Sequence, residues 1–102
     1  MRRNKCEDQY EMDELLERLE RFRDDRNWSK YHTSEALARE IMIEAGELNG
    51  LFEWGATPTP GRHREDLADV LICTLNACIA AGFDPIEICH EKINKNAVKY
   101  PA

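Results

Sequence analysis

The sequence predicts an all-α domain made of four helices. Apolar residues recur at spacings of three and four along four segments, which is the pattern of helices with one buried face. No segment shows the strict apolar–polar alternation that a half-buried strand requires. Glycine, proline and capping residues separate the four segments. At 102 residues the chain has the size of one domain, so residues 1–102 are expected to form a single unit.

The first two helices are separated by a polar and aromatic connector. The first is predicted over residues 8–23 and the connector over residues 24–32. The apolar side chains of the first helix follow helical spacing: Met12, Leu15, Leu16, Leu19 and Phe22. Thr33 or Ser34 is expected to cap the second helix, which continues to about Phe52.

The last two helices have clear boundary signals. Residues 55–61 contain two glycines and two prolines and therefore predict a break. The third helix is predicted from about Arg64 to Ala81 and ends at Gly82. Asp84 followed by Pro85 predicts the start of the fourth helix, which stops at Tyr100-Pro101.

The apolar faces predict that these helices are not fully covered within one chain. The third helix carries apolar residues around most of its circumference: Leu67, Val70, Leu71, Ile72, Leu75 and Ile79. It is therefore expected to be central, and part of its surface to be covered by a second subunit. The sequence thus predicts a four-helix bundle completed by homo-oligomerisation, as a dimer or a tetramer. Ile86, Ile93 and Ala97 are expected to point inward from the fourth helix.

Composition limits the classes of partner and compartment. The net charge of −6 disfavours nucleic acid as the primary partner. The longest apolar run is too short to span a membrane, and no apolar segment of a signal peptide follows the first four residues. Four cysteines without a C-x-x-C pair suggest reduced thiols in a cytoplasmic protein, not zinc ligands or disulfides.

Four acidic residues interrupt the apolar faces of the second and third helices. Glu44 lies within the apolar stripe of the second helix with Glu47 at its flank, and Asp66 and Asp69 share a face of the third. An unpaired carboxylate in apolar surroundings is unfavourable. Residues three apart project side by side, so the two pairs are suited to converge on Mg²⁺. The alternative is that they are partly exposed acids near helix ends.

A second metal motif is weighed against this interpretation. Glu87 and His90 form an E-x-x-H, which di-iron carboxylate bundles use on two different helices. Here the motif occurs once, and no second histidine falls on a predicted helix. His90 is therefore expected to be a surface or interface residue.

The acid motifs resemble those of the MazG-like all-α nucleotide pyrophosphohydrolases, particularly the dCTP pyrophosphatase branch. The pattern stands here as IEAGEL in the second helix and EDLADVLI in the third. The segments RDDRNWSKYHT, LFEW and KINKNAVKYP are also similar to that branch, so the resemblance covers residues 15–101.

The resemblance implies a reaction and a set of residue roles. Enzymes of this family hydrolyse a nucleoside triphosphate between the α- and β-phosphates, releasing the monophosphate and pyrophosphate. The implied Mg²⁺ ligands are Glu44, Glu47, Asp66 and Asp69, with a glutamate of the second helix as the general base. The implied substrate-binding residues are Trp28, His32 and Trp54 for the base and sugar, and Lys92, Asn96 and Tyr100 for the phosphates. The expected function is Mg²⁺-dependent hydrolysis of dCTP or a related nucleotide for nucleotide-pool sanitation.

Four departures from the family pattern leave the preferred base open, and one of them is the loop over residues 55–61, which is shorter than in the animal-type enzymes. Asp66 stands where the family has glutamate, Cys73 where tyrosine is found, and Leu19 where a histidine is expected near the base. Another base, or phosphoribosyl-ATP, is the alternative substrate, and a non-catalytic metal-binding dimerisation module is the alternative outside the enzyme class.

The implied binding residues also have simpler interpretations. Trp28 and Trp54 fit equally well as packing anchors at helix ends. Lys92 fits as a cation that complements the C-terminal helix dipole. Tyr100 fits as part of a packed helix stop.

Overall fold

The protein is described by a computed structural model that covers the backbone of residues 5–102 and the side chains from residue 11 onward. Residues 1–4, where the sequence predicts no signal peptide, and the Cys6 side chain lie outside these limits. The elements are α1 (Lys5–Asp25), η1 (Ser29–Tyr31), α2 (Ser34–Gly50), η2 (Glu53–Gly55), α3 (Pro60–Ala81) and α4 (Pro85–Lys99). No strand occurs in residues 5–102, so the prediction of an all-α fold with four helices is confirmed.

Side-chain caps set most helix ends where the sequence predicts them. The Thr33 hydroxyl accepts a hydrogen bond from the third N–H of α2 at 3.1 Å. The Asp84 carboxylate accepts two backbone N–H groups of the first turn of α4, at 2.9 and 3.3 Å. These contacts satisfy amide groups that a helix leaves unpaired at its start. Gly82 ends α3 with a φ of 76°, a left-handed conformation that glycine adopts without a steric penalty.

The predicted start of α3 is wrong by about four residues. The helix begins at Pro60 and not near Arg64, because Thr59 caps it and accepts a backbone N–H at 3.2 Å. A capping threonine followed by proline at the first helical position is itself a start signal. The other differences are smaller: α1 extends beyond the predicted residues 8–23 at both ends, and α2 ends at Gly50.

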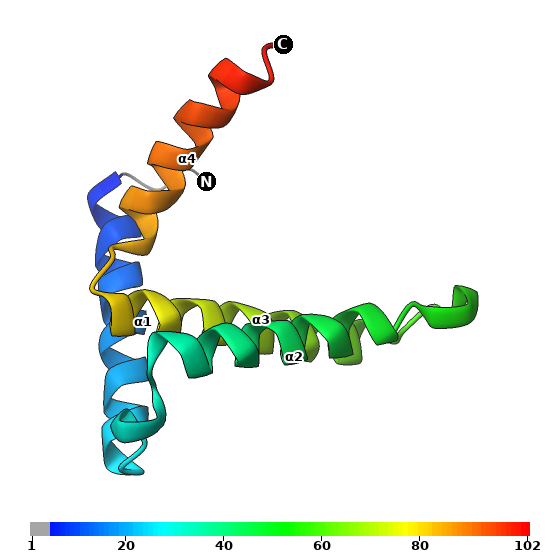
Figure 1. Cartoon of the computed structure of the whole chain (residues 1–102), viewed down its shortest axis with the longest axis horizontal. Coiled ribbons are helices and arrows are strands. Elements are labelled where there is room, and N and C mark those ends of the chain that lie inside the picture. Colours follow the sequence, from blue (N-terminus) through cyan, green and yellow to red (C-terminus); the bar gives the residue numbers. More distant parts are fainter. Residues whose placement is uncertain (1–4) are drawn as a thin grey trace.

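The centre of the fold is an antiparallel hairpin of α2 and α3 (Figure 1). The η2 segment lies at the tip of this hairpin. α1 crosses the other end, where α2 begins and α3 finishes (Figure 1). α3 contacts both α2 and α1, so its predicted central position is confirmed.

α4 leaves the end of α3 and diverges from α1 along its length (Figure 1). A groove of about 300 Å³ separates the first turns of α4 from α1 and α3. Ile86 is half-buried there, but Ile93 is 60% exposed and Ala97 is also exposed, so the prediction that both point inward is wrong for the single chain. In residues 5–102 no single helix is long and apolar enough to cross a bilayer; α3 and α4 meet the length and composition criteria only as a pair bent by 100°.

The single chain buries little of its apolar surface. Among the residues whose side chains the structure describes, only Leu37, Cys78 and Pro85 are buried, and none of them is completely enclosed. The chain exposes 8463 Å², whereas a compact monomer of this mass exposes roughly 5900 Å². Its radius of gyration is 16.0 Å, against about 13 Å for a compact chain of 100 residues. The excess surface is of the size that a stable homodimer buries.

We therefore expect the chain to assemble with further copies of itself. Light scattering at micromolar concentration should give a mass of at least two chains, because the exposed apolar faces of α3 and α4 are too large to remain in water. A mass of one chain over this concentration range would contradict the expectation.

Candidate functional site

The acids of α2 and α3 gather at the seam between the two helices. Glu44 is half-buried on α2, and the negative charges closest to it include Glu47 on the same helix and Asp69 on α3. Burial, followed by these two charges, raises the pKa of Glu44 above its usual range. A hydrogen bond with the Glu47 side chain and the charge of Glu40 act in the same direction. We call Glu40, Glu44, Glu47 and Asp69 the acidic cluster.

Three of the four predicted metal ligands belong to this cluster. Asp66 is half-buried one turn before Asp69 on α3, but it is not among the charges that shift the pKa of Glu44. Within the described residues, no three histidine, cysteine, aspartate or glutamate side chains are already arranged to hold one ion. The side chains therefore need to move closer together before they hold a metal.

The chemistry of the acidic cluster fits Mg²⁺. All of its donors are carboxylate oxygens, which are the ligands that this ion prefers, and Mg²⁺ usually takes one or two carboxylates together with water and substrate phosphates. Carboxylates without a cation repel one another, which favours the open arrangement seen here. The roles of Glu44, Glu47 and Asp69 as Mg²⁺ ligands remain predictions.

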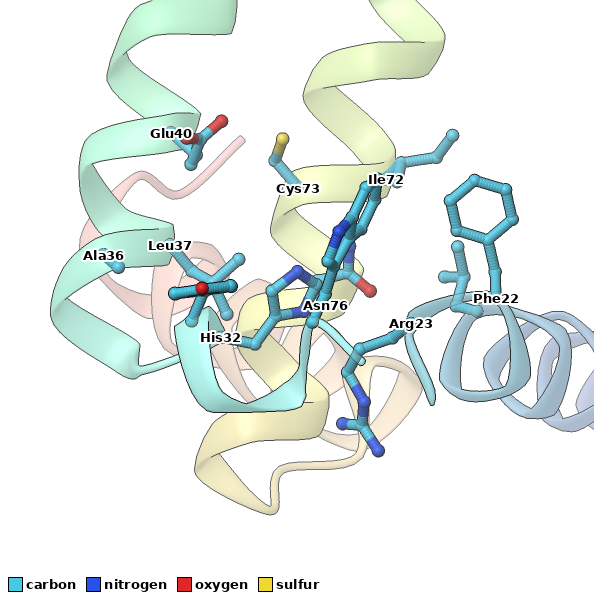
Figure 2. A pocket seen from close by; sticks show the side chains of 12 residues that line it. Phe22, Arg23, His32, Ala36, Leu37, Glu40, Ile72, Cys73 and Asn76 are labelled. Atoms are coloured by element: carbon cyan, nitrogen blue, oxygen red, sulfur yellow. The ribbon is translucent and has the colours of Figure 1, made fainter. Parts of the chain in front are cut away.

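A pocket of about 350 Å³ lies next to the acidic cluster (Figure 2). The end of α1, the η1 connector, the start of α2 and the middle of α3 each supply part of its wall. The lining residues are Leu19, Phe22, Arg23, Trp28, Tyr31, His32, Ala36, Leu37, Glu40, Ile72, Cys73 and Asn76. The walls are thus largely apolar and aromatic, with a few polar groups, as is usual for a small-molecule site.

Local contacts hold the aromatic wall in place. The rings of Phe22 and Trp28 meet edge to face, with their centroids 5.8 Å apart. The Arg26 guanidinium lies 3.4 Å from the centre of the Phe22 ring, and the Trp28 backbone N–H donates to the Arg23 carbonyl at 3.0 Å. The turn after α1 therefore fixes the position of Trp28, whose side chain stays 43% exposed.

The pocket and the acidic cluster share one boundary. Glu40 belongs to both, and Figure 2 shows it on the helix facing Cys73 across one end of the pocket. Burial, followed by the charges of Glu44, Glu40 and Asp69, raises the pKa of the Cys73 thiol. A molecule in the pocket therefore has a strip of negative charge at one end.

The predicted substrate-binding residues fall into two groups. Trp28 and His32 line the pocket. Trp54 lies in η2 at the far tip of the hairpin, where its side chain is 100% exposed and its φ is 59°. This conformation is unfavourable for a residue with a bulky side chain, so the backbone at Trp54 is strained while the ring makes no packing contact that would explain it.

The three predicted phosphate-binding residues lie on or just after α4, away from the pocket of their own chain. Lys92 is exposed, Asn96 is half-buried, and Tyr100 follows the last turn with its ring 67% exposed. Their predicted roles remain predictions. His90 is exposed on the same helix and lines the groove beside α1 and α3.

Several pocket residues were not predicted as site residues. Tyr31 and Arg23 gave no signal that distinguishes them from ordinary connector residues. Asn76 did give one, since it is a polar residue inside the apolar run of α3. Leu19 and Cys73, two of the departures from the family pattern, both line the pocket and so alter its wall.

Known proteins resemble this chain in both sequence and fold. No protein-family model matches it. The dCTP pyrophosphatase 1 of Homo sapiens is 32% identical over an alignment 92 residues long, which covers 79% of this chain and 54% of that protein. The Mus musculus protein of the same name is 28% identical over an alignment 90 residues long, which covers 78% of this chain and 53% of that protein. The chain thus spans about half the length of the curated relatives it matches.

A solved structure extends the similarity over nearly the whole chain. The crystal structure of a pyrophosphatase from Archaeoglobus fulgidus is 42% identical, has a TM-score of 0.82, and covers 90% of this chain and 94% of its own. The all-α fold, the acid motifs on α2 and α3 and these relatives lead to one conclusion: the chain belongs to the MazG-like pyrophosphatases, in the branch similar to dCTP pyrophosphatase.

Proposed function

We infer that this protein hydrolyses a deoxynucleoside triphosphate, dCTP or a close relative, to the monophosphate and pyrophosphate, and that it requires Mg²⁺. One observation carries the proposal: the 350 Å³ pocket opens at Glu40 and Cys73 onto the acidic cluster. A base held between the aromatic walls would extend its triphosphate toward the carboxylates. The names of the curated relatives support the same substrate class.

The proposed roles follow from the position of each residue. Trp28 and His32 would hold the base and sugar, and Glu44, Glu47 and Asp69 would hold Mg²⁺, with Asp66 joining them when the side chains close on the ion. When bound, Mg²⁺ supplies positive charge that offsets the charge of the phosphates. Without that charge, the phosphates and the carboxylates repel each other.

The hydrolytic step needs a group that accepts a proton. The oxygen of a water molecule forms a bond to one of the two phosphorus atoms joined by the α–β bridging oxygen. The bond from that phosphorus atom to the bridging oxygen breaks, so that the monophosphate and pyrophosphate separate. The water gives its proton to a carboxylate, for which Glu44 and Glu47 are the candidates because they lie beside the cation ligand on α3. Chain residues thus position the substrate and move one proton.

Replacing one ligand tests the metal site directly. Glu47→Ala should abolish pyrophosphate release from a panel of deoxynucleoside triphosphates, because an oxygen ligand is lost. In EDTA the variant should melt at the same temperature as wild type or higher, since one like charge is removed. Millimolar Mg²⁺ should raise the melting temperature of wild type by binding the folded state, and most of that rise should disappear in the variant.

A matched control separates this effect from simple loss of charge. Glu35 is an exposed acid on the same helix, paired with Arg39 at 2.9 Å, and it is not among the charges that raise the pKa of Glu44. Glu35→Ala should keep turnover and the Mg²⁺ response, since an exposed ion pair contributes less than about 1 kcal/mol. Identical wild-type melting curves in EDTA and in Mg²⁺, with and without nucleotide, would rule out the metal site and the enzyme proposed around it.

The two tryptophans test where the base binds. Trp28→Ala should weaken nucleotide binding by about 1–3 kcal/mol, the range for a base stacked on an aromatic ring. Trp54→Ala should weaken it similarly if η2 of another copy brackets the same base. Since Trp54 is fully exposed in its own chain, its removal should change the stability of the fold by no more than about 0.5 kcal/mol.

Binding titrations with melting curves on the same samples measure both quantities. Val98→Ala, which truncates another exposed apolar residue, should change neither. Unchanged nucleotide affinity in Trp28→Ala would show that the pocket does not hold the base. A large loss of stability in Trp54→Ala would instead identify Trp54 as a packing anchor in the assembly.

A further inference from the structure

The pocket contains few polar groups that a base can use. Arg23 is engaged by the carboxylate of Asp24, with Nε and Oδ1 2.9 Å apart. Glu40 belongs to the acidic cluster at the phosphate end. His32 and Asn76 are polar and half-buried in the pocket wall, whereas Trp28 and Tyr31, which also carry a polar group, are 43% and 63% exposed. Asn76 lies on α3, one turn after Ile72 and Cys73 and next to His32 of the connector (Figure 2).

The amide of Asn76 is unpaired within the part of the chain that the structure describes. No hydrogen bond there joins its carbonyl oxygen or its NH₂ group to another residue. In the described part of the chain, every side-chain nitrogen or oxygen that is completely buried has a hydrogen-bond partner. Because the Asn76 amide has none, its polar atoms must be accessible to solvent. A half-buried amide gains free energy when a ligand supplies the missing hydrogen bonds. Asn76 is therefore available from the pocket side.

An amide presents one acceptor beside one donor, and the polar edge of a pyrimidine does the same. Cytosine offers a donor at its 4-amino group beside an acceptor at N3, whereas uracil and thymine offer an acceptor at the 4-oxo group beside a donor at N3. Rotating an asparagine amide by 180° exchanges its donor and acceptor. The amide thus selects one edge only if another residue fixes its orientation.

We propose that Asn76 binds the polar edge of the base and that its unanchored amide accepts both the 4-amino and the 4-oxo pyrimidines. This inference rests on the proposed function, since it requires the pocket to hold the base. It narrows the substrate class to pyrimidine deoxynucleoside triphosphates. It also implies that the enzyme discriminates little between the 4-amino and the 4-oxo pyrimidines. Selectivity based on hydrogen bonds needs a site that leaves its own polar groups unpaired with the wrong base; a freely rotating amide avoids that penalty with either base.

The test compares kcat/KM for dCTP and dUTP in wild type and variants. In wild type the two values should agree within about tenfold, because the amide pairs with either edge. Asn76→Asp should shift the ratio toward dCTP by at least about tenfold, since cytosine protonated at N3 offers two adjacent donors to the two carboxylate oxygens, whereas uracil always keeps an acceptor at its 4-oxo group. Asn76→Leu should lower kcat/KM for both nucleotides by about the same factor, mainly through KM.

Controls separate a change in base recognition from added charge or misfolding. Thr74→Asp places the same charge two residues away, on an exposed side chain that does not line the pocket, and should leave the dCTP-to-dUTP ratio unchanged. Asn76→Leu adds no charge, so it keeps the test valid if Asn76→Asp does not fold. A wild-type preference far above tenfold, or a ratio that Asn76→Asp leaves unmoved, would overturn the proposal.

A binding experiment distinguishes failure of this inference from failure of the proposed function. Tryptophan fluorescence should report binding of dCMP and dUMP to wild type with similar affinities, and Asn76→Asp should favour dCMP. If no triphosphate is hydrolysed but this shift in binding is observed, the proposed activity is wrong while the assignment of Asn76 holds. If hydrolysis is observed but neither ratio moves, Asn76 does not bind the base.

Discussion

Packing α2 against α3 brings like charges into the seam between two apolar helices, and the rest of the site depends on this constraint. Glu44 is held half-buried near Glu47 and Asp69, and burial together with these charges raises its pKa. Among the residues that the structure describes, the charges that act on Glu44 are all negative. An arrangement of this kind is unfavourable by itself and becomes favourable when a divalent cation and an anionic substrate bind together.

One end of the pocket adjoins the acidic cluster, so a molecule in the pocket would have carboxylates at that end. Its walls come from segments that are far apart in sequence, and the turn after α1 keeps the Trp28 ring in place through Phe22 and Arg26. A largely apolar wall strengthens each hydrogen bond made inside it. In the proposed function, the few polar groups of the wall, Asn76 among them, therefore contribute more to the choice of base than their number suggests.

Four of the substrate-binding residues implied by the family resemblance do not line the pocket, and they lie on segments that project away from α1 and from the start of the α2–α3 hairpin. Trp54 lies at the tip of the α2–α3 hairpin, and Lys92, Asn96 and Tyr100 lie on or just after the diverging α4 (Figure 1). A positive φ at an exposed tryptophan is strained and persists only when something else favours it. These observations agree with the exposed apolar surface: the tips and helix faces left open in one chain are suited to contact another copy.

The sequence by itself determined the helices and the line of acids, because both depend on local spacing. Thr33, Asp84 and Gly82 fixed helix ends through contacts within one turn, and the three-residue spacing of Glu44 and Glu47 placed both on one face. Only the tertiary structure decided which polar side chains share a pocket. The set of pocket residues depends on how α1 crosses the hairpin and on the path of the η1 connector. Asn76 and Tyr31 line the pocket for this reason, whereas α4 contributes no residue to its wall. Such contacts join residues distant in sequence, and no local pattern records them.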